Sequence, residues 1–277
     1  MLRIKYISPQ PVATPRLILG CAVFFTVCGI AAVASAQATT NRTIRVVCYN
    51  IMDDIDGFTT PLAGLIAPFG GGSFTESSSG TVTNGGVLEG IGEENVGPDP
   101  AQPIDILALE ETTSNTNTVQ PIVNGLNTFY SLSNPAASNM YAMSAYQATE
   151  QGGIITNGNG PNAMVYNTTT VQLVASVPVD PVGGTSQLGS PSGEYREVMR
   201  YEFAPAGLTV TSSNVFYIYV SHYKAKTTPT DQNDRTGEAT IIRNDEANHL
   251  PANARVIYLG DYNVSTSGEL SYQIILS

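Results

Sequence analysis

Short blocks of apolar residues, separated by polar and glycine-rich segments, favour buried β-strands over long helices. β-Branched and apolar side chains fill residues 43–50, and an apolar run at 104–109 ends in two glutamates. Further strands are predicted at 197–203, 215–220 and 255–259, and a hairpin at 163–166 and 171–174 around the turn 167–170. Several strands are apolar on both faces, which predicts that both faces are covered. The pattern therefore predicts an α/β (α+β) sandwich of two mostly antiparallel sheets flanked by helices.

Two segments break this strand pattern. Residues 231–249 form the clearest predicted helix, bounded by Pro229 and Pro251, and a weaker helical pattern covers 118–126. Residues 57–103 contain 11 Gly and 5 Pro but no Lys or Arg, and they lack periodicity. We expect this stretch to be a loop-like insertion, either a mobile surface loop or a lid beside a site.

The first 36 residues have the pattern of a secretory signal. Three basic residues precede an apolar run at 17–33, which small residues follow at 34–36. We expect cleavage before Gln37, which leaves one domain over 37–277, secreted to the periplasm or outside the cell and without stable membrane association. The alternative is an uncleaved membrane anchor, since the run is nearly long enough to span a bilayer.

Removal of this leader changes the charge and the cysteine content. The leader holds three basic and no acidic residues, so the net charge falls from −11 to −14. Such an acidic chain is unsuited to gripping nucleic acid through a basic groove alone. Cys48 is then the only cysteine, so an internal disulfide is excluded, and we expect it to be a small buried residue of a strand.

Polar residues that packing does not require stand at the ends of four of the predicted strands. Asn50 ends the first strand, Glu110 and Glu111 end the next, His222 ends another, and Asp261 with Asn263 ends the last. Strands of one sheet often end at a common edge, so these side chains are candidates for convergence. Carboxylate and amide oxygens suit a hard divalent cation: Mg²⁺ first, with Mn²⁺ or Ca²⁺ as alternatives. This chemistry indicates metal-assisted attack of water on a phosphate ester.

Each of these residues also has an ordinary structural interpretation. An Asn after a strand is usually a turn residue, and adjacent glutamates at a strand end are usually solvated. His222 is explained equally well as a site residue or as a residue that hydrogen-bonds backbone groups. The order of the residues and their position at strand ends favour a site.

The segments that carry these residues resemble successive motifs of the endonuclease/exonuclease/phosphatase family, which includes DNase I-like nucleases. They are Arg45-Val46-Val47-Cys48-Tyr49-Asn50, Asp105-Ile106-Leu107-Ala108-Leu109-Glu110-Glu111, Ser221-His222-Tyr223-Lys224 and Leu259-Gly260-Asp261-Tyr262-Asn263. The helix with Arg235 and Glu238-Ala239 is similar to secreted bacterial nucleases of this family. The resemblance covers about 43–56 and 104–270 and implies a four-layered, DNase I-like α/β sandwich.

The resemblance also implies a role for each site residue. Glu111 would be the principal metal ligand, and Asn50 a second metal-side or phosphate contact. Asp261 would orient the attacking water beside Asn263, which lies next to the phosphate. His222 would stabilise the scissile phosphate or assist the leaving group. These roles imply a metal-dependent phosphoesterase, most simply an endonuclease acting on nucleic acid as a monomer.

The sequence departs from the family pattern in two places. Glu110 stands where the family usually has Gln, which would add negative charge near the metal. The family closes with further strands and an Asp-His pair whose His is the general base, and no His follows His249. We therefore expect a C-terminally truncated chain with impaired activity, since loss of such a base costs roughly 10²–10⁴ in rate. Arg196 and Lys224 are weaker candidates for phosphate contacts.

Two other functions fit the same sequence. A lipid phosphodiesterase or a small phosphate-ester phosphatase would use the same residues on another substrate. A non-catalytic, secreted, β-rich binding or surface protein would also explain the Gly-, Ser-, Thr- and Asn-rich composition. Metal binding that depends on Glu111 would separate the enzymes from this last class.

Overall fold

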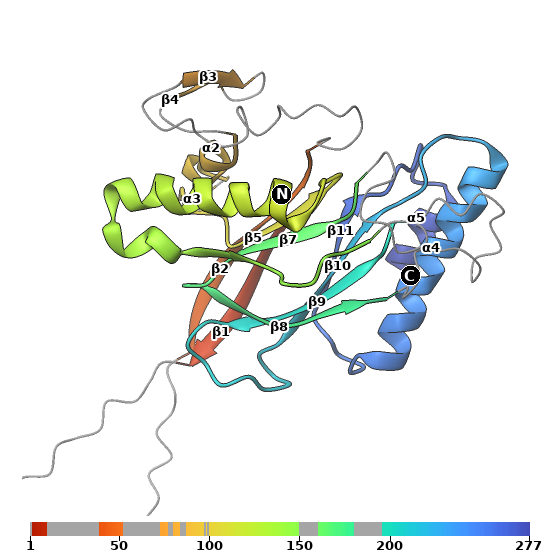
Figure 1. The fold of residues 1–277 in the computed structure, drawn as a ribbon. Helices are drawn as coiled ribbons and strands as arrows, with labels where there is room; N and C mark the ends of the chain where they lie inside the picture. Colours follow the sequence, from red (N-terminus) through yellow and green to blue (C-terminus); the bar gives the residue numbers. More distant parts are fainter. Residues whose placement is uncertain are drawn as a thin grey trace, which may run out of the picture.

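The computed structural model describes residues 2–9, 39–51, 73–76, 80–83, 87–96, 98, 100–149, 160–179 and 196–277. Two large sheets stack face to face and carry helices on their outer sides (Figure 1). The leader run 17–33 and much of the 57–103 segment lie outside the described residues. Within the described part, no helix combines the length and the hydrophobicity needed to cross a membrane.

The first sheet has five strands in the order β1-β2-β5-β7-β6. Its strands are β1 (Leu2–Pro9), β2 (Thr39–Asn50), β5 (Ile106–Glu110), β6 (Tyr141–Met143) and β7 (Ala163–Asn167). Strands β2 and β5 run parallel, whereas the other neighbours in this sheet are antiparallel. Strand β1 lies in the segment expected to be a signal and pairs with β2.

The second sheet has four strands in the order β11-β10-β9-β8. They are β8 (Val171–Pro178), β9 (Met199–Pro205), β10 (Phe216–His222) and β11 (Val256–Asp261). Only β10 and β11 run parallel, because helix α4 (Pro229–His249) crosses over between them. Every residue of β10 is buried, as its apolar sequence predicts for a central strand.

The predicted hairpin at 163–174 is wrong. Strand β7 pairs with β5 and β6 in the first sheet, whereas β8 pairs with β9 in the second. The intervening turn passes from one sheet to the other, and the Asn167 side chain stabilises it by accepting hydrogen bonds from the backbone N–H and the hydroxyl of Thr169. Sequence spacing alone does not distinguish a hairpin from a crossover between stacked sheets.

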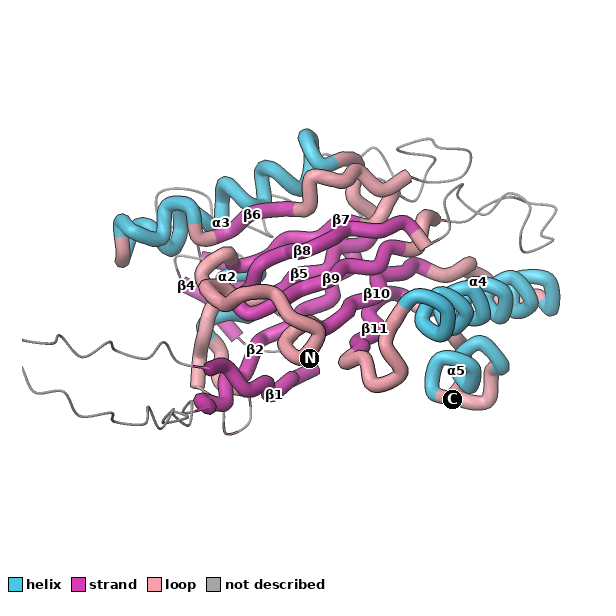
Figure 2. The backbone as a smooth tube through the Cα atoms, turned by 90° about the horizontal axis from the view of Figure 1, so that it is seen from below, coloured by secondary structure: helices cyan, strands magenta, loops and turns pink. Residues whose placement is uncertain are grey.

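Helices complete the outer layers. These are α2 (Val87–Glu93), the π-helical turn Asn115–Val119, α3 (Gln120–Ser133), the 3₁₀ turn Pro135–Asn139, α4 and α5 (Leu270–Leu276). Figure 2 shows α3 on one side of the stacked sheets and α4 with α5 on the other. The predicted helix 231–249 is confirmed and starts at Pro229, where Thr228 and Asp231 form a capping box.

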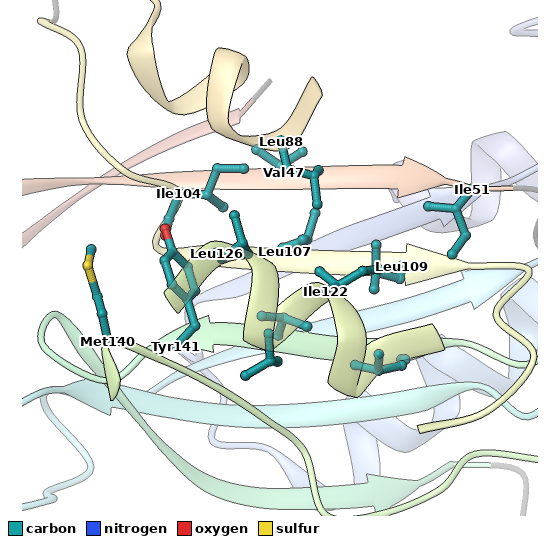
Figure 3. Packing of buried hydrophobic residues seen from close by; sticks show 14 of the residues in the cluster. Val47, Ile51, Leu88, Ile104, Leu107, Leu109, Ile122, Leu126, Met140 and Tyr141 are labelled. Atoms are coloured by element: carbon teal, nitrogen blue, oxygen red, sulfur yellow. The ribbon is translucent and has the colours of Figure 1, made fainter. Parts of the chain in front are cut away.

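Three apolar layers hold these elements together. One lies between the sheets and includes Ile106, Phe203 and Ile218. A second packs α2 and α3 on the first sheet and includes Leu88, Leu107 and Ile122 (Figure 3). The third lies between the second sheet and the helices α4 and α5. The predicted α/β sandwich is therefore confirmed, with helix, sheet, sheet and helix as its layers.

Parts of the segment 57–103 are regular, against the expectation of a loop. Strands β3 (Ser73–Glu76) and β4 (Gly80–Thr83) form an antiparallel pair, and α2 follows them. Leu88 of α2 is fully buried against the first sheet, and the Arg45 guanidinium donates hydrogen bonds to the carbonyls of Ile91 and Gly92. Apolar packing and these hydrogen bonds therefore hold α2 in place. The high glycine content of the segment had favoured a loop instead.

Candidate active site

Four strand ends meet at one edge of the stacked sheets. In the parallel pair β2/β5, Asn50 is level with Glu110, and in the parallel pair β10/β11, His222 is level with Asp261. Parallel neighbours end on the same side of a sheet, and β11 packs across the sandwich on β2 and β5. The convergence expected from the sequence is therefore present in the structure.

The side chains at this edge lie within hydrogen-bond or ion-pair distance of one another. The Asn50 Nδ2 atom donates to Glu111 Oε1 at 2.8 Å and reaches Asp261 Oδ2 at 3.4 Å. His222 Nε2 lies 3.6 Å from Glu111 Oε1 and 3.8 Å from Asp261 Oδ2. Two carboxylates from different sheets thus share one amide and one imidazole.

A turn with unusual backbone geometry brings Glu111 into this group. Strict alternation after β5 would direct Glu111 away from Glu110, towards the α3 side. Instead Glu111 has φ of +58°, a left-handed conformation that non-glycine residues seldom adopt. Gly160 packs against this turn so closely that a Cβ there would lie 2.7 Å from the Glu111 carbonyl carbon. Backbone strain of this kind is typical of functional sites.

Close contact between β10 and β11 positions Asp261. Gly260 has φ of +147°, and a Cβ at this residue would lie 1.7 Å from the Ser221 carbonyl oxygen. The strands therefore approach more closely than a side chain would allow. Asp261 then accepts a hydrogen bond from the Asn263 backbone N–H at Oδ1 (3.0 Å), which closes the turn.

Burial opposes a positive charge on His222. Burial, with a smaller contribution from the Arg196 charge, lowers the pKa of His222 to about 3. Its Nδ1 atom is buried and has no hydrogen-bond partner among the residues that the structure describes. The imidazole is therefore suited to hydrogen bonding with a substrate oxygen rather than to supplying positive charge.

That Glu110 adds negative charge near a bound metal stays a prediction. Glu110 is fully buried, and burial raises its pKa to about 8. The Cys48 thiol donates a hydrogen bond to Glu110 Oε1 at 2.9 Å. Cys48 itself is exposed, against the expectation of a buried residue.

The remaining sequence candidates lie behind these side chains. Asn263 donates through Nδ2 to the Tyr223 carbonyl oxygen at 3.0 Å and so ties the two site loops together. The Arg196 guanidinium donates to the His222 carbonyl oxygen at 3.3 Å. Arg196 and Lys224 are 7% and 8% exposed, so both lie beneath the site and contribute to its support. Direct phosphate contacts from these two residues stay a prediction.

A cluster of charged residues, which includes Arg235 and Glu238 of the helix motif noted in the sequence, holds the site loops. Arg235 of α4 is fully buried and donates to the carbonyls of Lys224 and Lys226, both at 2.7 Å. It also forms a two-nitrogen ion pair with Glu269, beyond the Asp261 turn. Glu238, one turn further along α4, accepts the backbone N–H of Lys224 at 3.0 Å. Arg235 and Glu238 are three residues apart, which places them on one helix face. This spacing is the feature of the sequence that could have indicated the cluster.

The donor set for a cation is small. Within the described ranges, no group of three or more His, Cys, Asp or Glu side chains is arranged to hold a metal. Glu111 and Asp261 offer two carboxylates, and the Asn50 amide contacts both. This fits Mg²⁺, which commonly takes one or two protein carboxylates and completes its shell with water and substrate phosphate.

Comparisons with known proteins find matches among solved structures alone. No protein-family model matches the chain, and no curated protein matches it. Among solved structures, it resembles the human Nocturnin catalytic domain with bound sulfate, at 20% identity and a TM-score of 0.40, over 61% of this chain and 55% of that one. An endonuclease/exonuclease/phosphatase family protein from Bacteroides thetaiotaomicron matches at 15% identity and a TM-score of 0.40, over 62% and 54%.

A third match is D. rerio TDP2, solved with a single-strand DNA product. Its identity is 15% and its TM-score 0.33, over 59% of this chain and 50% of that one. The chain thus spans about half the length of these three solved structures. These matches are distant in sequence, and the proposed function is argued from the chain's own residues.

Proposed function

We propose that this chain is a divalent-cation-dependent phosphoesterase that hydrolyses phosphodiester bonds, most simply those of nucleic acid. The observation that carries this proposal is the meeting of Asn50, Glu111, His222 and Asp261 at one sheet edge. There, two carboxylates from different sheets lie close to one amide and one imidazole. Such a set is suited to placing a cation, a phosphate and a water together.

Each residue has a role in the proposed reaction. Glu111 and Asn50 would hold the cation, Mg²⁺ first, which when bound supplies charge stabilisation at the phosphoryl oxygens. Asp261 accepts a hydrogen bond from the attacking water and holds it in line with the phosphorus. His222, neutral in its buried setting, donates a hydrogen bond to a phosphoryl oxygen or to the leaving oxygen. Asn263 fixes the Asp261 turn.

The net charge of the chain affects how it can bind a phosphate-containing substrate. The sequence outside the expected signal carries a net charge of −14, which repels phosphate polymers unless cations compensate. A bound cation at Glu111 provides such compensation locally. We therefore propose nucleic acid as substrate with binding that weakens sharply when divalent cations are removed.

We also propose that the chain is secreted after cleavage of its signal. Residues 1–36 carry the signal pattern, and cleavage before Gln37 would also remove β1, which pairs with β2. N-terminal sequencing of the protein exported by its host tests this directly. Gln37 as the first residue supports the proposal, and an intact Met1 in exported protein contradicts it.

Turnover assays test the proposed activity. Purified chain is incubated with plasmid DNA, a bis-aryl phosphodiester and an aryl phosphate monoester, with Mg²⁺ or with EDTA. We expect slow, Mg²⁺-dependent cleavage of the diesters, and at least tenfold less in His222→Ala. His249→Ala is the matched control, because His249 is 60% exposed in its side chain and lies at the end of α4. Equal loss in both variants, or turnover that persists in EDTA, contradicts the proposal.

A further inference from the structure

A small apolar cavity lies between the second sheet and α5. Its volume is about 160 Å³, and four tyrosines contribute to its walls: Tyr223, Tyr258, Tyr262 and Tyr272. Ser271 and Ile275 of α5 close it from the helix side. None of its lining residues carries a charge, and its exposed surface is almost wholly apolar.

The cavity lies on the opposite side of the catalytic strands from the candidate site. Tyr223 follows His222, and Tyr262 lies between Asp261 and Asn263, so alternation directs the tyrosines towards α4 and α5. The cavity therefore does not belong to the phosphate site. It adjoins that site through the backbone, because the Asn263 amide donates to the Tyr223 carbonyl.

The side chains explain why the space is not filled. Ser271 is fully buried on α5, at a position where a larger apolar residue would project into the cavity. Its hydroxyl is instead bonded to Glu269 Oε1 at 3.0 Å. Leu276 lines the cavity and is 64% exposed, so the cavity reaches solvent at that residue.

We propose that this cavity binds a single aromatic ring. An apolar cavity of about 150 Å³ is large enough for benzene. The tyrosine walls favour an aromatic guest, since rings attract each other edge-to-face. Tyr223 and Tyr262 already pack in this way, with centroids 4.8 Å apart and planes at 62°. An ionised ligand is disfavoured because no wall residue carries a charge that would compensate its desolvation.

Ring binding is measured by NMR titration and calorimetry on the full chain, with benzene and then indole as probes and no divalent cation. We expect saturable binding of one benzene per chain. Ser271→Leu fills the cavity and should weaken benzene binding at least tenfold. Ser267→Leu is the matched control: it adds the same side chain at an exposed serine of the preceding loop and should leave the affinity unchanged.

A second variant keeps the proposal testable if Ser271→Leu fails to fold. Ile275→Ala enlarges the cavity and should raise the affinity for indole relative to benzene by tenfold or more. Absence of saturable benzene binding to the wild type overturns the proposal, as does equal binding by the two serine variants or an unchanged ring preference in Ile275→Ala. These outcomes are independent of phosphoesterase activity, because the assay contains neither cation nor phosphate ester.

Discussion

At the scale of single residues, Gly260 is where the two strands of the site come closest. Its φ is +147°, and a Cβ at this position would lie 1.7 Å from the Ser221 carbonyl oxygen, so there is no space for a side chain. Gly207 offers a comparison, because its φ is +75° and no atom lies within 4 Å of a Cβ there.

We expect Gly260→Ala to lower the free energy of unfolding by about 3 kcal/mol or more, because it adds a backbone clash to conformational strain. Gly207→Ala should cost about 1–2 kcal/mol, from the left-handed backbone alone. Urea denaturation of both variants measures the difference. Equal destabilisation would show that β10 and β11 are not so close at Asp261.

Some features of single residues could be predicted from the sequence, and others could not. The strand ends at Asn50, His222 and Asp261 were predictable, because apolar runs mark strands and their last polar residues are visible. The left-handed turn at Glu111 was not, since it depends on Gly160 packing against it from a distant loop. The raised pKa of Glu110 was also hidden, because burial is a tertiary property.

At the scale of elements, α4 holds the loops that carry the site. Arg235 bonds the segment after His222 and, through Glu269, the segment after Asp261. This pair also keeps the pKa of Glu269 below its usual value. Removing one partner of a buried ion pair is strongly destabilising, because the other charge is left uncompensated.

We expect Arg235→Met to destabilise the fold by about 3–5 kcal/mol, since it leaves Glu269 and two carbonyls without their donor. Arg255→Met is the control: Arg255 also donates to backbone carbonyls, but its bond to the Ser213 carbonyl is exposed. That variant should lose about 1 kcal/mol or less. Thermal and urea unfolding compare the two, and similar losses would refute the role assigned to Arg235.

Most of the helices and strands could be predicted from the sequence, but the pairing of the strands could not. Pro229, the capping residues and Pro251 delimit α4 in the sequence. The pairing of β8 with β9 instead of β7 was missed, because a four-residue turn between two apolar runs fits a hairpin as well as a crossover. Helix α2 was missed because its glycines obscure a short amphipathic pattern whose Leu88 is buried.

At the scale of the whole molecule, buried ionisable groups make stability depend on pH. Burial raises the pKa of Glu238 to about 8, well above its value in an unfolded chain. Between about pH 4.5 and 8 the unfolded state has therefore released a proton that the native state retains, so stability falls as pH rises. One such group contributes a slope of about 1.4 kcal/mol per pH unit.

We expect Glu238→Gln to remove this slope while its carbonyl oxygen still accepts the Lys224 backbone N–H. The measurement is the free energy of unfolding from pH 4.5 to 8 for wild type and variant. The difference between them should grow as pH rises, in favour of the variant. A constant difference across that range would show that Glu238 is ionised in the native state.

The central claim is that the four strand ends form a cation-dependent site. Calorimetric titration with Mg²⁺ and Mn²⁺ tests it most directly, on wild type, Glu111→Ala and the control Glu93→Ala, which removes an exposed glutamate at the end of α2. We predict binding of one cation by wild type and Glu93→Ala, and affinity at least tenfold lower in Glu111→Ala. Indistinguishable binding by wild type and Glu111→Ala would contradict the account.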